Sequence, residues 1–130
     1  MLPEISSIMT QRTELPTLAE WQLDVLRQFA IFKANTEEVR YALWGVFEFD
    51  LEPERRASQS HFRVPEPGIL LTRDHIANAL EREQRGSISH HELVDWATML
   101  LLNDAYQPDP KDEDFVAEWL NRISQDFDPT

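Results

Sequence analysis

Residues 86–102 read GSISHHELVDWATMLLL, and this segment holds the clearest helix signals in the chain. Gly86 is typical of the residue just past a helix end, because glycine adopts positive φ without steric cost. Ser89 and Glu92 have the spacing of a capping box, in which each side chain accepts a hydrogen bond from the other residue's backbone amide. The segment therefore predicts a helix that starts after Ser89. Its expected inner face is Leu93, Trp96, Ala97, Leu100 and Leu101.

Four more helices are predicted around this one, from apolar residues that recur every three or four positions. Before it we expect a helix from Pro16, a second from Thr36 and a third capped by Thr72. After it, Asp109 is the expected cap of the last helix, with Pro110 at the first helical position. We expect the first helix to bury one face, formed by Leu18, Trp21, Val25, Phe29 and Phe32.

The four tryptophans are expected to anchor the core and not to form an exposed binding surface: Trp21, Trp44, Trp96 and Trp119.

The apolar pattern changes its period between residues 46 and 65. Phe47 and Phe49 alternate with acidic residues, as in a half-buried strand. We expect residues 53–60 to form a polar loop and residues 61–64 to return as the second strand of a short hairpin.

The predicted fold is a mainly α, single-domain helical bundle of about five helices, with a short β-hairpin at residues 46–65. A chain of 130 residues allows one domain rather than two. Residues 1–13 show no periodicity and are predicted to be a flexible N-terminal segment, so residues 14–130 form the expected helical domain. Phe127 is expected to fold back onto the last helix.

Composition excludes several classes of function. The formal net charge of −12 argues against binding to nucleic acid or to an anionic membrane, because both need a basic surface. The absence of cysteine removes thiol nucleophiles and thiolate metal sites. The three glycines are isolated from one another, unlike the glycine clusters that approach phosphates closely. The first nine residues lack the basic start of a signal peptide, so a cytoplasmic protein is expected.

One motif suggests metal chemistry. His91 and Asp95, with Glu92 between them, resemble the zincin pattern H-E-x-x-H with a carboxylate in place of the second histidine. A third ligand would have to come from His61, His75 or His90, and Glu92 already belongs to the capping box. We therefore predict a solvated helix start here, no metal or other cofactor, and a protein that is not an enzyme.

The negative charge is concentrated at the C-terminal end. Residues 86–130 contain ten acidic and two basic residues, which gives them a formal charge of −8. Such a surface either keeps the protein soluble or attracts a basic partner, since opposite potentials speed association. Phe115, Trp119 and Tyr106 are the nearest aromatic anchors. The residues predicted to bind a partner are Asp104, Tyr106, Asp109, Asp112, Glu113, Asp114, Glu118 and Asp126, and Asp128 adds to the charge.

A second signal comes from Ala79-Leu80-Glu81, Gly86-Ser87-Ile88-Ser89, Glu92-Leu93 and Trp96-Ala97. This pattern, with an acidic final helix, resembles small bacterial immunity proteins of the colicin D type and spans Asp74 to Ser124. The resemblance implies a cytoplasmic, non-enzymatic inhibitor that occupies the basic site of a nuclease toxin.

Three alternatives stay open. A phage-type inhibitor that mimics nucleic acid would carry regularly spaced carboxylates along a groove. A metal hydrolase centred on His91 and Asp95 would hold stoichiometric zinc. A structural or regulatory scaffold would form a stable oligomer and have no basic partner.

Overall fold

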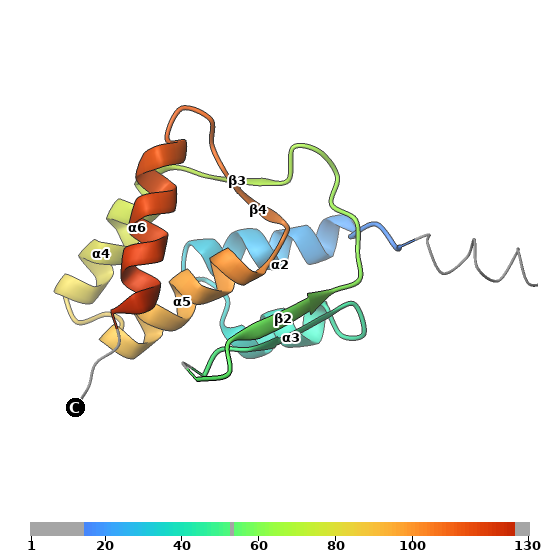
Figure 1. The fold of residues 1–130 in the computed structure, drawn as a ribbon, viewed down its shortest axis with the longest axis horizontal. Coiled ribbons are helices and arrows are strands. Elements are labelled where there is room, and N and C mark those ends of the chain that lie inside the picture. The colour runs from blue at the N-terminus through green and yellow to red at the C-terminus, as the bar shows by residue number, and fades with distance from the viewer. Residues whose placement is uncertain (1–14, 53, 127–130) are drawn as a thin grey trace, which may run out of the picture.

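The computed structural model describes residues 15–52 and 54–126, and in these ranges the chain is mainly helical (Figure 1). The expected segment 1–13, Phe127 and Asp128 lie outside the described residues. Five helices and two short two-stranded sheets make up the described fold, so the predominance of helices and the presence of a hairpin are confirmed, and the second sheet was not predicted. The helices are α2 (Glu20–Ala30), α3 (Thr36–Ala42), α4 (Arg73–Gln84), α5 (His90–Leu102) and α6 (Glu113–Gln125); the strands are β1 (Phe47–Asp50), β2 (Ala57–Ser60), β3 (Ile69–Leu71) and β4 (Tyr106–Pro108).

Helix α5 forms where residues 86–102 predict a helix, but it is buried on more than the expected face, and Leu101 of that face is 42% exposed. The Ser89 hydroxyl accepts from the Glu92 amide, and the Glu92 carboxylate accepts from the Ser89 amide, each at 3.0 Å. Gly86 has a φ of +78° just past α4, where the amide of Ser87 donates to a carbonyl of the last turn. The buried residues of α5 lie on all sides of it: Leu93, Val94, Trp96, Ala97, Thr98, Met99 and Leu100.

Helix α6 packs across α5 and also contacts α4 (Figure 1). It begins at Glu113, so the expected start at Asp109 and Pro110 is wrong. The Asp109 carboxylate accepts from the Lys111 amide, and its carbonyl accepts from the Asp112 amide. These two bonds close a turn before the helix begins, and Asp112 is the residue at the N-cap.

The hairpin is present, but its second strand is β2 and not residues 61–64. Strands β1 and β2 are antiparallel, with Phe47 opposite Ser60. β1 supplies the buried phenylalanines, and polar β2 is held by hydrogen bonds instead. The Ser58 hydroxyl donates to the Leu102 carbonyl at 2.9 Å, and the Arg56 guanidinium donates to the Ser124 carbonyl. Strand β2 therefore forms through backbone pairing with β1, although it lacks the alternating apolar residues from which we predicted the second strand at residues 61–64.

A second sheet pairs β3 with β4 in parallel, with Ile69 opposite Tyr106. Three residues in each strand are too few to produce a readable period, so sequence patterns miss it. The sheet brings the segment before α4 next to the segment before α6. The Tyr106 hydroxyl then donates to the Leu26 carbonyl of α2 at 2.6 Å.

The expectation of a core anchored by four tryptophans is wrong for two of them. Trp96 is 1% exposed, and its indole N–H donates to the Ala30 carbonyl at 3.2 Å. Trp21 is 54% exposed and Trp44 79%. The buried residues of α2 are Leu23, Leu26, Phe29 and Ala30, and Trp21 points to the opposite side of that helix. Among the described residues, no helix has both the length and the apolar character needed to span a membrane.

Candidate functional site

The predicted partner-binding residues do not form one continuous surface. Tyr106 is 5% exposed and cannot serve as the expected aromatic anchor, so that prediction is corrected. Its ring fills the space between β4 and α2, and its hydroxyl is bound by the Leu26 carbonyl. Burial raises the pKa of this hydroxyl well above its usual value, so Tyr106 is a neutral core residue.

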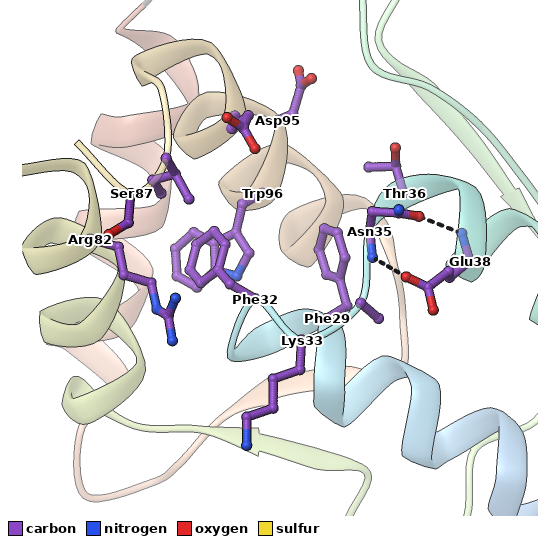
Figure 2. Close-up of a pocket in the computed structure, with 13 residues that line it drawn as sticks. Phe29, Phe32, Lys33, Asn35, Thr36, Glu38, Arg82, Ser87, Asp95 and Trp96 are labelled. Carbon is purple, nitrogen blue, oxygen red and sulfur yellow. Dashed lines mark hydrogen bonds between the residues drawn. The ribbon is translucent and has the colours of Figure 1, made fainter. Parts of the chain in front are cut away.

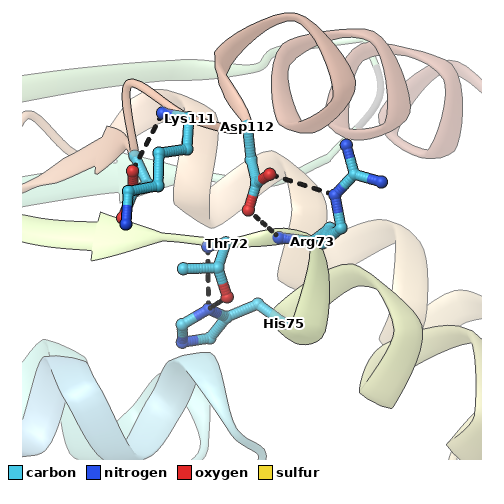
Figure 3. Close-up of polar contacts among 6 residues, drawn as sticks. Thr72, Arg73, His75, Lys111 and Asp112 are labelled. Carbon is cyan, nitrogen blue, oxygen red and sulfur yellow. Dashed lines mark hydrogen bonds and ion pairs between the residues drawn. The ribbon is translucent and has the colours of Figure 1, made fainter.

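Asp109 and Asp112 both have structural roles before and at the start of α6. Figure 3 shows the contacts of Asp112. The Asp112 carboxylate accepts from the backbone amide and from the guanidinium of Arg73, each at 3.0 Å. These hydrogen bonds and the positive charge of Arg73 hold the pKa of Asp112 below its usual value. Asp112 therefore ties the start of α6 to the start of α4, where the Thr72 amide also donates to His75 Nδ1.

Three of the predicted carboxylates remain exposed together on α6: Glu113, Asp114 and Glu118. We call these residues the α6 acidic face. Glu118 forms an ion pair with Arg122 at 3.0 Å. Within residues 15–52 and 54–126, no cation pairs with Glu113 or Asp114 within 4 Å. Most of the negative charge on this helix is therefore uncompensated.

An aromatic pair borders the α6 acidic face. Phe115 and Trp119 are half-buried, and their ring centroids are 6.2 Å apart. The Arg73 guanidinium lies 4.6 Å from the Phe115 centroid, and the Arg122 guanidinium lies 4.9 Å from the Trp119 centroid. The surface of α6 thus combines exposed carboxylates with the partly exposed rings that the sequence analysis named as anchors.

Asp104 and Asp126 are not part of α6. Asp104 is exposed in the connection between α5 and β4. Asp126 follows the C-terminal end of α6, one helix length of roughly 20 Å from its start. Its carbonyl accepts from His90 Nε2 at 2.7 Å. Asp126 therefore lies at the opposite end of α6 from Asp114.

The zincin-like motif forms a pair of side chains. His91 Nε2 is 3.3 Å from an Asp95 carboxylate oxygen, and burial raises the pKa of Asp95. Of the expected third ligands, His90 contacts Glu83 and His75 contacts Thr72. In the described part of the chain, no three histidine or acidic side chains gather as a metal-binding group.

A cavity of about 400 Å³ was not anticipated from the sequence (Figure 2). It lies between the α2–α3 connection, the end of α4 and the start of α5, and we call it the Phe32 cavity. Its lining includes Phe32, Trp96, Lys33 and Arg82. The apolar spacing predicts Phe32 on the core face of the first helix, and no sequence pattern gives Lys33 or Arg82 a role. No sequence signal places these residues together, because they come from three separate segments.

Comparison with known proteins gives no assignment. The chain matches no protein-family model, and the searches of curated proteins and of solved structures also found no match. The resemblance to immunity proteins therefore stays a prediction, and any functional argument starts from the surface of α6 and the Phe32 cavity.

Proposed function

We propose that this protein is a non-enzymatic binding module of the immunity or antitoxin type, which docks a basic partner through the α6 acidic face. The observation that carries the proposal is the set of exposed carboxylates at Glu113, Asp114 and Glu118 beside the aromatic pair Phe115 and Trp119. The partner class that fits is a protein with a basic surface, such as a nuclease toxin or another nucleic-acid-binding protein.

Charge and aromatic area have different roles in this interface. Uncompensated carboxylates attract a basic surface over roughly one Debye length, about 8 Å at physiological salt, and so increase the association rate. Affinity depends more on rings that become fully buried on binding. Phe115 and Trp119 are still partly exposed in the free protein, so both can lose further surface to a partner.

The acidic face is also held in a fixed position. Val116, Leu120 and Ile123 of α6 are buried in the core, and Asp112 fixes the start of the helix to Arg73. A surface that is already ordered loses little conformational entropy on binding. A rigid inhibitory surface that occludes the partner's basic site is consistent with this arrangement.

The test uses two double charge reversals. Asp114→Lys with Glu118→Lys inverts the α6 acidic face and leaves the Asp112 tether intact. Glu48→Lys with Glu54→Lys makes the same charge change at exposed hairpin positions, neither of which forms an ion pair in the described ranges. Proteins captured from a lysate of the native host by the wild type are identified, and the partner is purified. Its association rate with all three proteins is then measured at low salt.

We expect the α6 reversal to slow association by at least about tenfold and the hairpin reversal by much less. Equal rates for the two reversals would show that only net charge matters, and the proposed docking surface would be wrong. Circular dichroism and thermal unfolding of each variant establish that it remains folded.

A further inference from the structure

The Phe32 cavity contains a backbone conformation that is unusual for an aromatic residue. Phe32 has a φ of +65°, in the left-handed region that glycine normally occupies. It ends α2: its amide donates to the Phe29 carbonyl, and the Lys33 amide donates to the Gln28 carbonyl at 2.7 Å. Glycine would satisfy this helix end without strain. The contacts of the Phe32 side chain must therefore stabilise the fold by more than the strain of its positive φ destabilises it.

The strained backbone places the Phe32 ring on the wall of the cavity. The ring stacks on buried Trp96 with a centroid distance of 5.1 Å and an interplanar angle of 24°. The Arg82 guanidinium lies over the same ring, 5.7 Å from its centroid. Phe29 and Ile88 continue the apolar lining. The cavity thus offers an aromatic surface next to a cation.

The acidic side chains of the cavity already have partners. Glu38 accepts from the Asn35 amide at 3.1 Å, and Glu92 accepts from the Ser89 amide at 3.0 Å. Asp95 lies 3.3 Å from His91. Figure 2 shows Asp95 on one side of the Phe32–Trp96 stack, whereas the side chains of Lys33 and Arg82 extend to the other.

The cations of the cavity are not neutralised. Arg82 donates to the side-chain oxygen of Asn78 at 3.3 Å, which is a neutral partner. Throughout the described ranges, neither Lys33 nor Arg82 has a carboxylate within ion-pair distance, although six other arginines do. Both also border an adjoining hollow of about 450 Å³, whose carboxylate, Asp74, pairs with neither of them. Two unpaired cations at one opening are unexpected in a chain of net charge −12.

We propose that the Phe32 cavity binds a small ligand that carries a carboxylate or phosphate on a flat aromatic ring system. The ring contacts the partly exposed Phe32, next to the buried Phe29 and Ile88, and the anion is bound by Lys33 and Arg82. A volume of about 400 Å³ lies within the usual range of small-molecule sites. Salt screens the distant carboxylates of the protein. The three carboxylates that line the cavity are held by the Asn35 amide, the Ser89 amide and His91, whereas Lys33 and Arg82 have no carboxylate partner in the described ranges and can contact an anion directly. No α6 residue lines the cavity, so this proposal is independent of the docking surface.

Four probes separate the ring from the anion. Adenosine monophosphate carries a phosphate together with an aromatic ring system, and indole-3-acetate carries a carboxylate. Adenosine has the ring system without the phosphate, and inorganic phosphate has no ring. Binding is measured by isothermal titration calorimetry with the full chain. The variants are Lys33→Gln and Arg82→Gln, and the matched control is Arg85→Gln, which removes an exposed cation three residues away that does not line the cavity.

We expect at least one aromatic anion to bind at least about tenfold more tightly than adenosine or phosphate. Whichever binds identifies the anion as phosphate or carboxylate. Lys33→Gln and Arg82→Gln should each weaken that binding by about fivefold or more, and Arg85→Gln by less than about twofold. The proposal is wrong if neither aromatic anion binds, if adenosine or phosphate binds as tightly, or if Arg85→Gln has the same effect as Arg82→Gln. Thermal unfolding of each variant shows whether a loss of binding reflects a loss of fold.

Discussion

Gly68 and Gly86 have nearly the same backbone conformation but different surroundings. Their φ angles are +80° and +78°, and a side chain is strained at either position. A Cβ on Gly86 would meet nothing within 4 Å, whereas a Cβ on Gly68 would lie 2.9 Å from the Ala105 carbonyl oxygen. That carbonyl accepts from the Ile69 amide, next to the paired strands β3 and β4.

Alanine at these two positions separates strain from steric conflict. We expect Gly86→Ala to lower the free energy of unfolding by about 1 kcal/mol through backbone strain alone. Gly68→Ala should cost at least about 1 kcal/mol more, because backbone atoms must move to accept the methyl group. Urea unfolding of both variants measures the difference. Equal losses would mean that the close approach of residues 68 and 105 contributes nothing.

His90 connects three helices and depends on its protonation state. Its Nδ1 lies 2.5 Å from a Glu83 carboxylate oxygen at the end of α4, and its Nε2 lies 2.7 Å from the Asp126 carbonyl. Both partners are acceptors, so both hydrogen bonds require the imidazolium form. The hydrogen bond to Glu83, followed by that to Asp126, raises the pKa of His90 above its usual value.

The stability supplied by His90 should therefore decrease as pH rises. It is fully present below the pKa of an unfolded histidine, about 6.5, and is lost as pH passes the higher pKa of the folded state. We expect the stability difference between wild type and His90→Gln to be larger near pH 5.5 than near pH 9. Denaturant unfolding at both pH values tests this. A difference that is the same at both would show that the imidazolium bridge does not contribute.

Elements with short-range signals could be predicted from the sequence. The capping box of Ser89 and Glu92, and the helix end at Gly86, depend on residues close together in the chain, and both are confirmed. Strand β2 and the β3–β4 pair depend on contacts between distant segments, and the start of α6 depends on the contact of Asp112 with Arg73 as well as on the local turn at Asp109. Those contacts decide between several locally acceptable conformations, so sequence patterns either misplaced these elements or missed them.

The candidate sites follow the same division. The exposed carboxylates at Glu113, Asp114 and Glu118 could be found from charge alone. The sequence could not show that Tyr106 is buried against α2 or that the Asp112 carboxylate binds Arg73, because each contact depends on tertiary packing. The Phe32 cavity could not be predicted from the sequence for a further reason. Phe32 has a positive φ, which phenylalanine rarely adopts.

At the scale of the whole molecule, the proposed function depends most on the uneven distribution of negative charge along the chain. Residues 86–130 carry a formal charge of −8, and the structure places part of it on α6 beside two aromatic rings. The Phe32 cavity has unpaired cations and is formed by other elements. The two proposed sites therefore rely on groups of opposite charge and share no lining residue, so we expect variants of one to leave binding at the other unchanged.

The most direct test of the proposed function is the salt dependence of partner association. The association rate with the captured basic partner is measured from about 30 mM to about 500 mM salt for the wild type, the α6 reversal and the hairpin reversal. The proposed function predicts a steep decrease with salt for the wild type and the hairpin reversal, and a nearly flat dependence for Asp114→Lys with Glu118→Lys. An equally steep decrease for the α6 reversal would contradict docking through the α6 acidic face.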